Sequence, residues 1–160
     1  MTESAPATER ELRAEIDINA TPAKVWAILT DFANLADASP ELVAMKPLLP
    51  GGLRLGQHYL GWNRRKSFFW PTLNTVITLE DEKTIAWDTI GSGARWIFEL
   101  TPTTTGTRVV QRRPIPVGRA AIGRFVATYF LGGATSHDDE LQAGMGQTLI
   151  HLKQLAEAPH

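Results

Sequence analysis

Four histidines are the side chains of this chain best suited to moving protons near neutral pH: His58, His137, His151 and His160. No two of them have the His-x-x-x-His spacing that builds a zinc site on one helix face. We therefore expect no metal and no cofactor. His58 falls on a predicted strand, where it could serve as a general base, although an ordinary half-buried or exposed histidine is the commoner outcome. Asp88 and Glu99 are carboxylates that could complete such a set, but nothing in the sequence places them beside His58.

Several kinds of catalysis are excluded or unsupported by the composition. The chain has no cysteine, which excludes disulfides, thiolate nucleophiles and cysteine-held metals or clusters. It contains no Gly-x-Ser-x-Gly elbow, no phosphate-binding loop and no dinucleotide fingerprint. The reaction chemistry, if there is any, must rest on ordinary polar side chains.

Five tryptophans are many for a chain of 160 residues. Strand alternation places Trp96, Phe98 and Leu100 on one face, and Trp87 on the face of Ile85. Each tryptophan alone favours core packing over ligand contact. Together, on neighbouring strands, they favour the wall of an apolar pocket. The residues we predict to line it are Trp62, Trp70, Trp87, Trp96, Phe98, Met145 and Leu149.

Two glycines, Gly144 and Gly146, interrupt the last predicted helix, where each costs about 1 kcal/mol relative to alanine. Close packing of helix and sheet would offset that cost. Space for a ligand beside Met145, or a flexible bend, are the alternatives.

Basic residues gather in two places. Arginines from Arg108 to Arg124 flank an apolar run, so the segment Arg119–Leu131 could be a lid, a membrane-surface contact, a partner site or an ordinary packed helix. Arg64-Arg65-Lys66 is a second basic run, typical of a solvated turn.

The elements that must position these residues begin with a strand over Glu11–Asn19, where apolar and polar residues alternate. Thr21-Pro22 predicts a helix start, since threonine caps free N–H groups and proline suits the first turn. Val25, Ile28, Leu29 and Phe32 give that helix an apolar face, and a short helix over Asn34–Ala38 should end at Ser39-Pro40.

The middle of the chain predicts an antiparallel meander, because its strands follow one another across short turns. The predicted strands are Leu42–Leu48, Leu55–Asn63, Phe68–Leu79, Thr84–Ile90, Arg95–Thr101 and Thr107–Arg113. Helical spacing returns in Ile122–Phe130 and then from about His137 to Glu157, with Ser136 as a candidate cap. Only that long terminal helix can cover the apolar face of such a sheet.

This order of elements resembles the helix-grip superfamily of START proteins, birch-pollen-allergen-like proteins and polyketide cyclases (SRPBCC). The residues that carry the resemblance are Ala20–Trp26, Asp31–Asn34, Gly61–Arg64, Trp70, Trp96–Pro102, Gly106–Val109, Gly144-Met145, Thr148-Leu149 and Leu152-Lys153. The resemblance implies an α+β fold in which a curved antiparallel sheet of about six or seven strands wraps one long C-terminal helix, with two short helices after the first strand. It also singles out Arg64, within Gly-x-Asn-Arg, as a partner for a carboxylate or anionic ligand group.

The length, composition and net charge of the chain limit its possible domain organisation, partners and location. With 160 residues and 43% hydrophobic residues, one domain over residues 10–158 is expected, after a flexible tail at residues 1–9. The formal net charge of −1 gives no reason to expect nucleic-acid binding. We find neither a secretory signal nor a run of apolar residues long enough to span a membrane, so a cytoplasmic location is expected. The oligomeric state is left open.

Two functions remain, besides that of a membrane- or partner-facing adaptor using Arg119–Leu131. The first is binding of a small hydrophobic molecule, lipid-like or aromatic, between the sheet and the long helix. The alternative is an enzyme of the polyketide cyclase, aromatase or dehydratase kind, with His58, Arg64 and Asp88 as its catalytic candidates. The wealth of aromatics and the lack of paired acid and base residues favour binding.

Overall fold

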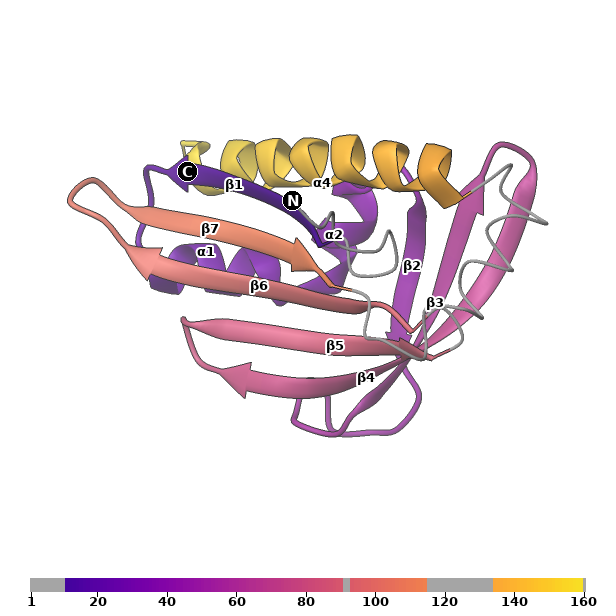
Figure 1. Cartoon of the computed structure of the whole chain (residues 1–160). Helices are drawn as coiled ribbons and strands as arrows, with labels where there is room; N and C mark the ends of the chain where they lie inside the picture. The colour runs from indigo at the N-terminus through magenta and orange to yellow at the C-terminus, as the bar shows by residue number, and fades with distance from the viewer. Residues whose placement is uncertain (1–10, 91–92, 115–133, 160) are drawn as a thin grey trace, which may run out of the picture.

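The fold is described from a computed structural model, which covers residues 11–90, 93–114 and 134–159. A seven-stranded antiparallel sheet is ordered β1-β7-β6-β5-β4-β3-β2, and its curved inner side holds the helices (Figure 1). The elements are β1 (Leu12–Ile18), α1 (Pro22–Leu29), α2 (Phe32–Ala38), β2 (Leu42–Pro47), β3 (His58–Arg65), β4 (Phe68–Glu80), β5 (Thr84–Ile90), β6 (Arg95–Pro102), β7 (Thr107–Arg113) and α4 (Ala134–Glu157). The α+β helix-grip expectation, with its sheet of six or seven strands, is confirmed.

The two short helices follow β1 as the sequence indicates. The Thr21 hydroxyl accepts a hydrogen bond from the Lys24 N–H, and Pro22 opens α1, so the predicted cap is confirmed. Phe32, however, which its spacing assigns to the first helix, belongs to the second. The first helix ends at Thr30, whose N–H and hydroxyl both bond the Trp26 carbonyl, and Asp31 then caps α2.

One strand begins later than predicted. β3 starts at His58 rather than at Leu55, because the residues before it form a looped turn with Gly56 at φ +83°. The buried Gln57 side chain holds that loop by donating to the carbonyls of Leu49 and Gly52. The other predicted strands lie within one residue or so of the observed bounds.

The long helix α4 packs across the inner side of the sheet. Its residues Leu149, Leu152 and Ala156 join a core cluster with Phe98 and Val109 of the sheet, all nearly inaccessible to solvent. Since α4 begins at Ala134, Ser136 lies inside it and the predicted cap is wrong. The segment 115–133, which includes the predicted lid or membrane contact Arg119–Leu131 and the helical pattern of Ile122–Phe130, lies outside the described residues, as do residues 1–10.

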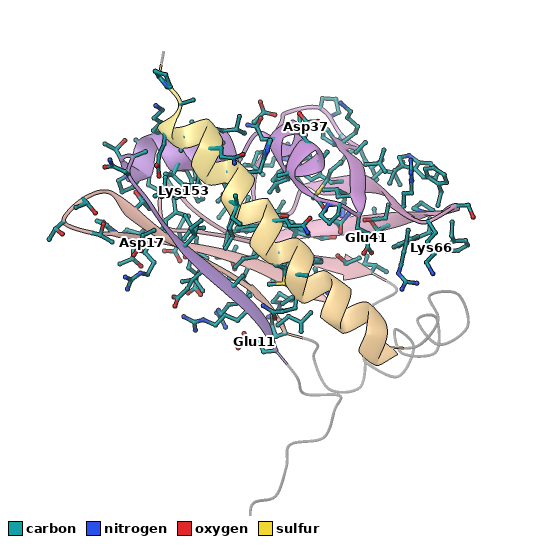
Figure 2. The ribbon with its side chains drawn as sticks, turned by 90° about the horizontal axis from the view of Figure 1, so that it is seen from above. Glu11, Asp17, Asp37, Glu41, Lys66 and Lys153 are labelled. Atoms are coloured by element: carbon teal, nitrogen blue, oxygen red, sulfur yellow. The ribbon has the colours of Figure 1, made fainter. Side chains whose placement is uncertain are left out.

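The outer edge of β1 is bridged to α4 by side chains of the helix. Gln142 bonds both the N–H and the carbonyl of Arg13, Lys153 donates to the Asp17 carbonyl at 2.8 Å, and Glu157 accepts from the Asn19 N–H at 3.0 Å. Figure 2 shows Lys153 on the helix above Asp17 on β1. Polar groups of an edge strand attract other chains when they are left open, so this bridging protects the edge.

Candidate functional site

Strand alternation determines which side chains point to the inner face of the sheet, where the core residues lie. Trp87 stacks on Phe98, with ring centroids 5.8 Å apart, and meets the ring of Phe32 edge-on at 5.5 Å. Phe98 and Leu149 are each 1% exposed and Trp87 is 5% exposed. These three predicted pocket residues therefore meet in the core between the sheet and α4, where they are closely packed against their neighbours.

Trp96 and Met145 meet farther along the same face. Trp96 lies beside Trp87 in the register of β5 and β6 and packs in a smaller cluster with Met145 and Leu12. Unlike Trp87, Trp96 is only half-buried. The sequence thus brings together Trp87, Trp96, Phe98, Met145 and Leu149, from two strands and the long helix.

An arginine and a glutamine border this smaller cluster. The guanidinium of Arg113 lies over the Trp96 ring, 5.1 Å from its centroid, although Arg113 is only 7% exposed. Gln111, one inner-face position away on β7, is also buried, and its Oε1 atom has no hydrogen-bond partner among the described residues. Buried polar atoms are nearly always hydrogen-bonded in native proteins, so Gln111 has unused capacity at this point.

A network of amides and hydroxyls occupies the inner face of β3, β4 and β5. Thr89 donates to Asn74 Oδ1 at 2.8 Å, and the Asn74 amide donates to Thr72 Oγ1 at 3.2 Å. Asn63 donates to the same hydroxyl at 3.1 Å. Gly61 makes room for the network, since a Cβ there would stand 2.5 Å from Thr72 Oγ1.

Trp70 stands next to this network. It pairs with Asn63 in the register of β3 and β4, is half-buried, and stacks on Phe68 with centroids 5.6 Å apart. Trp70 and Trp96 are thus inner-face tryptophans that are only half-buried, and β5, which contributes Thr89 to the amide network, lies between their strands.

Four sequence-predicted residues lie on the outer face instead. His58 and Trp62 alternate with the inward Tyr59 and Gly61, and the His58 ring contacts Thr75 Oγ1 through Nδ1 at 2.9 Å. Trp62 is 45% exposed. Arg64 lies over the Phe69 ring at 5.8 Å. Asp88 accepts two hydrogen bonds from Arg95, at 2.7 and 3.1 Å.

Burial raises the pKa of the Tyr59 hydroxyl, whose ring packs edge-on against Phe32. The hydrogen bond to Asp88 raises the pKa of Arg95 on the outer face, so that pair is an ion pair at neutral pH. Within the described ranges no cluster of three potential ligands could hold a metal ion.

Strand alternation alone predicts several inward-facing residues that the aromatic residues do not indicate. Thr107, Val109, Gln111 and Arg113 occur at every second position of β7, so the inward Val109 implies an inward Gln111 and Arg113. The network around Asn74 gave no such signal, because polar residues on a half-barrel are expected to face water.

Comparison with known proteins now identifies the fold family. Residues 9–148 match the family described as "Polyketide cyclase / dehydrase and lipid transport". The chain belongs to this family. No curated protein matches the chain in sequence.

Solved structures of the same fold are distant in sequence. A polyketide-cyclase-like protein of Corynebacterium glutamicum, Cgl2372, shares 20% identity with a TM-score of 0.62, covering 92% of this chain and 91% of that one. TTHA0849 of Thermus thermophilus shares 16% identity with a TM-score of 0.68, covering 93% and 100%. The chain also matches about half of StfQ, a di-domain aromatase/cyclase of steffimycin biosynthesis, at 14% identity with a TM-score of 0.70, covering 92% and 50%.

Family members bind small hydrophobic molecules or act as cyclases on them, and this chain shares their sheet and terminal helix. Within the described parts of the chain, no helix is long and apolar enough to cross a membrane. The cytoplasmic location remains a prediction.

Proposed function

We propose that this protein binds a small hydrophobic molecule, aromatic or polyketide-like, between the inner face of the sheet and α4. The binding region is the half-buried end of that face, bounded by Trp70, Trp96 and Met145. Trp87, Phe98 and Leu149 support this wall from the packed core. Indole and thioether surfaces suit flat, apolar ligands, because they offer large contact areas and adaptable packing.

The observation that carries the proposal is the position of Arg113 and Gln111. Burying a guanidinium is costly, and so is burying an amide oxygen that has no partner among the described residues, as at Gln111. A fold keeps such groups when they serve a purpose. The Arg113 guanidinium stands beside the aromatic ring of Trp96, where it would donate to a carboxylate, phenolate or keto oxygen, and the Gln111 Oε1 atom would accept from a ligand hydroxyl. We infer that the ligand carries one such oxygen group at the end of its apolar body.

The alternative of a cyclase draws support from the inner-face amides and hydroxyls around Asn74, which could hold keto oxygens of a folded chain. StfQ, with the same fold, is an aromatase/cyclase. Against it, the described strands β3 to β7 present no carboxylate or histidine on their inner face, and His58, Arg64 and Asp88 lie on the outer one. Proton transfer is therefore the weaker of the two proposals.

The test is a binding panel of fatty acids, flavonoids and polycyclic phenols, followed by tryptophan emission and calorimetry. We expect at least one binder, with a negative heat-capacity change from apolar burial. Arg113→Met should weaken a carboxylate or phenolate ligand by about tenfold or more and a neutral analogue much less. Arg64→Met is the matched control, because Arg64 lies over an aromatic ring on the opposite face.

Failure would take a definite form. If no member of the panel binds, or if Arg113→Met and Arg64→Met change affinity equally, the inner face is plain core. Turnover of a poly-keto substrate that disappears in Asn74→Ala while binding persists would move the cyclase ahead of the binding protein.

A further inference from the structure

Charge is unevenly distributed along the chain. Acidic and basic residues nearly balance overall, at 17 and 16, yet residues 42–79 contain no aspartate or glutamate. The same stretch, which spans β2, β3 and most of β4, contains five basic residues: Lys46, Arg54, Arg64, Arg65 and Lys66. This stretch is therefore cationic in a protein with a net charge of −1.

Exposed apolar side chains gather in the same stretch. Among the described residues, seven of the nine exposed large hydrophobic side chains lie there: Val43, Leu48, Leu49, Leu55, Trp62, Phe68 and Phe69. Single exposed apolar residues need no explanation, but a contiguous group with a polar rim marks an interaction surface.

The strand register joins some of these residues into one outer-face patch. Trp62 pairs with Pro71, and Arg64 pairs with Phe69, on the outer side of β3 and β4. Leu73 pairs with Leu60 on one side and with Ile90, which is 52% exposed, on the other. We call this group the outer patch: Leu60, Trp62, Phe69, Pro71, Leu73 and Ile90, bordered by Lys46 and Arg64.

The β3–β4 hairpin also extends the outer patch beyond the end of β5. β4 pairs with β5 only from Leu73 onward, so its first residues pair with β3 alone and the tip projects past the end of β5 (Figure 1). Lys66, at φ +58°, forms the turn, and Figure 2 shows it at the outer end of the hairpin.

We propose that the outer patch docks this protein on an anionic lipid surface. Tryptophan and phenylalanine beside arginine and lysine are the composition that settles at the boundary between head groups and acyl chains. Each basic residue near an anionic surface adds attraction. Of the carboxylates beside the patch, Asp88 is paired with Arg95, and Glu41, whose carbonyl accepts from the Arg64 N–H, is half-buried.

Pairing of β2 with a second copy is the less suitable use of this end of the sheet. Pro47 lacks the N–H that an added strand requires, and Lys46 places a charge beside it. The patch lies on the face opposite to Trp96 and Arg113, so the docking proposal stands or falls independently of the proposed ligand.

The test is co-sedimentation of the full chain with phosphatidylcholine vesicles, with and without phosphatidylglycerol. We expect binding only to the anionic vesicles, decreasing as salt is added. Trp62→Ser should weaken it by about tenfold, the loss expected for one aromatic side chain, and Arg64→Glu should weaken it similarly. Ile150→Ser, at a similarly exposed site on α4, is the matched control and should bind as wild type.

A second measurement does not require removing the aromatic side chain at position 62. Trp62→Phe keeps an aromatic ring and should still bind, yet brominated phosphatidylglycerol should quench its tryptophan emission much less than that of wild type. The proposal is overturned if wild type ignores anionic vesicles, if Ile150→Ser loses as much binding as Trp62→Ser, or if the patch instead mediates dimerisation in the absence of lipid.

Discussion

The two edges of the sheet are treated in opposite ways. At the β1 edge, three side chains of α4 bond the backbone of the strand, and ion pairs such as Asp17–Arg108 cover its outer face. At the β2 edge, Pro47 and Lys46 replace such bridges, and the neighbouring hairpin presents exposed aromatics. The β1 edge is covered by α4, and we call it the closed end. The β2 edge and the neighbouring β3–β4 hairpin remain accessible, and we call them the open end.

The difference shows that the residues that stabilise the fold and the exposed surface that can contact other molecules lie in separate parts of one sheet. The closed end contains the residues that hold α4 to the core, and the open end contains most of the exposed apolar surface of the described residues. Substitutions at the two ends should therefore fail in different ways, which the following experiments measure.

The largest effect is expected at the closed end, at Leu149. Leu149 is 1% exposed within the core cluster, so Leu149→Ala should lower the free energy of unfolding by about 2–5 kcal/mol in denaturant titration. Ile150→Ala, next to it but exposed, should cost less than about 0.5 kcal/mol. Equal losses at the two sites would contradict the assigned face of α4.

The second-largest effect tests whether the inner face of the sheet is tightly packed at the open end. A methyl group at Gly61 would collide with Thr72 Oγ1, so Gly61→Ala should destabilise the protein by about 1–3 kcal/mol in the same titration. A gain in stability at this site would show that the amide network around Asn74 is loosely held.

The matched substitution on α4 should have the opposite sign. Apart from its chain neighbours and the backbone of its own helix, no atom of the described residues lies within 4 Å of a Cβ built at Gly146, so Gly146→Ala should stabilise the helix by about 0.5–1 kcal/mol. Gly144 differs, because its Cβ would stand 3.0 Å from Pro40 Cγ. Close packing thus explains Gly144, though against the turn after α2 rather than the sheet, and open space surrounds Gly146. A loss of stability in Gly146→Ala, measured by thermal unfolding, would contradict this account.

The smallest effect is electrostatic and belongs to the β1 edge. A hydrogen bond from Arg108 holds the pKa of Asp17 below its usual range, and one from Lys153 does the same for Glu157. Because the folded pKa values are lowered, their contribution is present above the unfolded values and is lost as pH falls below about 5. Asp17→Asn should flatten that part of the pH–stability profile slightly, and an unchanged slope would contradict the pairing.

Much of the fold could be predicted from local patterns. The cap at Thr21, the turn at Ser39-Pro40 and the hairpin between Arg95 and Arg113 depend on residues close in sequence, so their signals survive without tertiary context. The predicted start of β3 is wrong because Gln57 acts on carbonyls several residues back, which no periodicity records.

The candidate site was less predictable, for a physical reason. Alternation within one strand gives each side chain's face relative to its neighbours, but the face that meets the helix is fixed only by pairing between strands. Trp62 and Trp70 illustrate this: both belong to the same hairpin, and the register with Pro71 and Asn63 sends them to opposite faces.

The most direct test of the binding proposal is a methyl and indole NMR titration with a ligand found in the panel. Three methionines give separable probes, and Met145 packs in the Trp96 cluster whereas Met45 lies in the main core. The account predicts the largest shifts at the Met145 methyl and the Trp96 indole N–H, with the Trp62 indole unchanged. Shifts concentrated at Trp62, with Met145 and Trp96 unmoved, would contradict it.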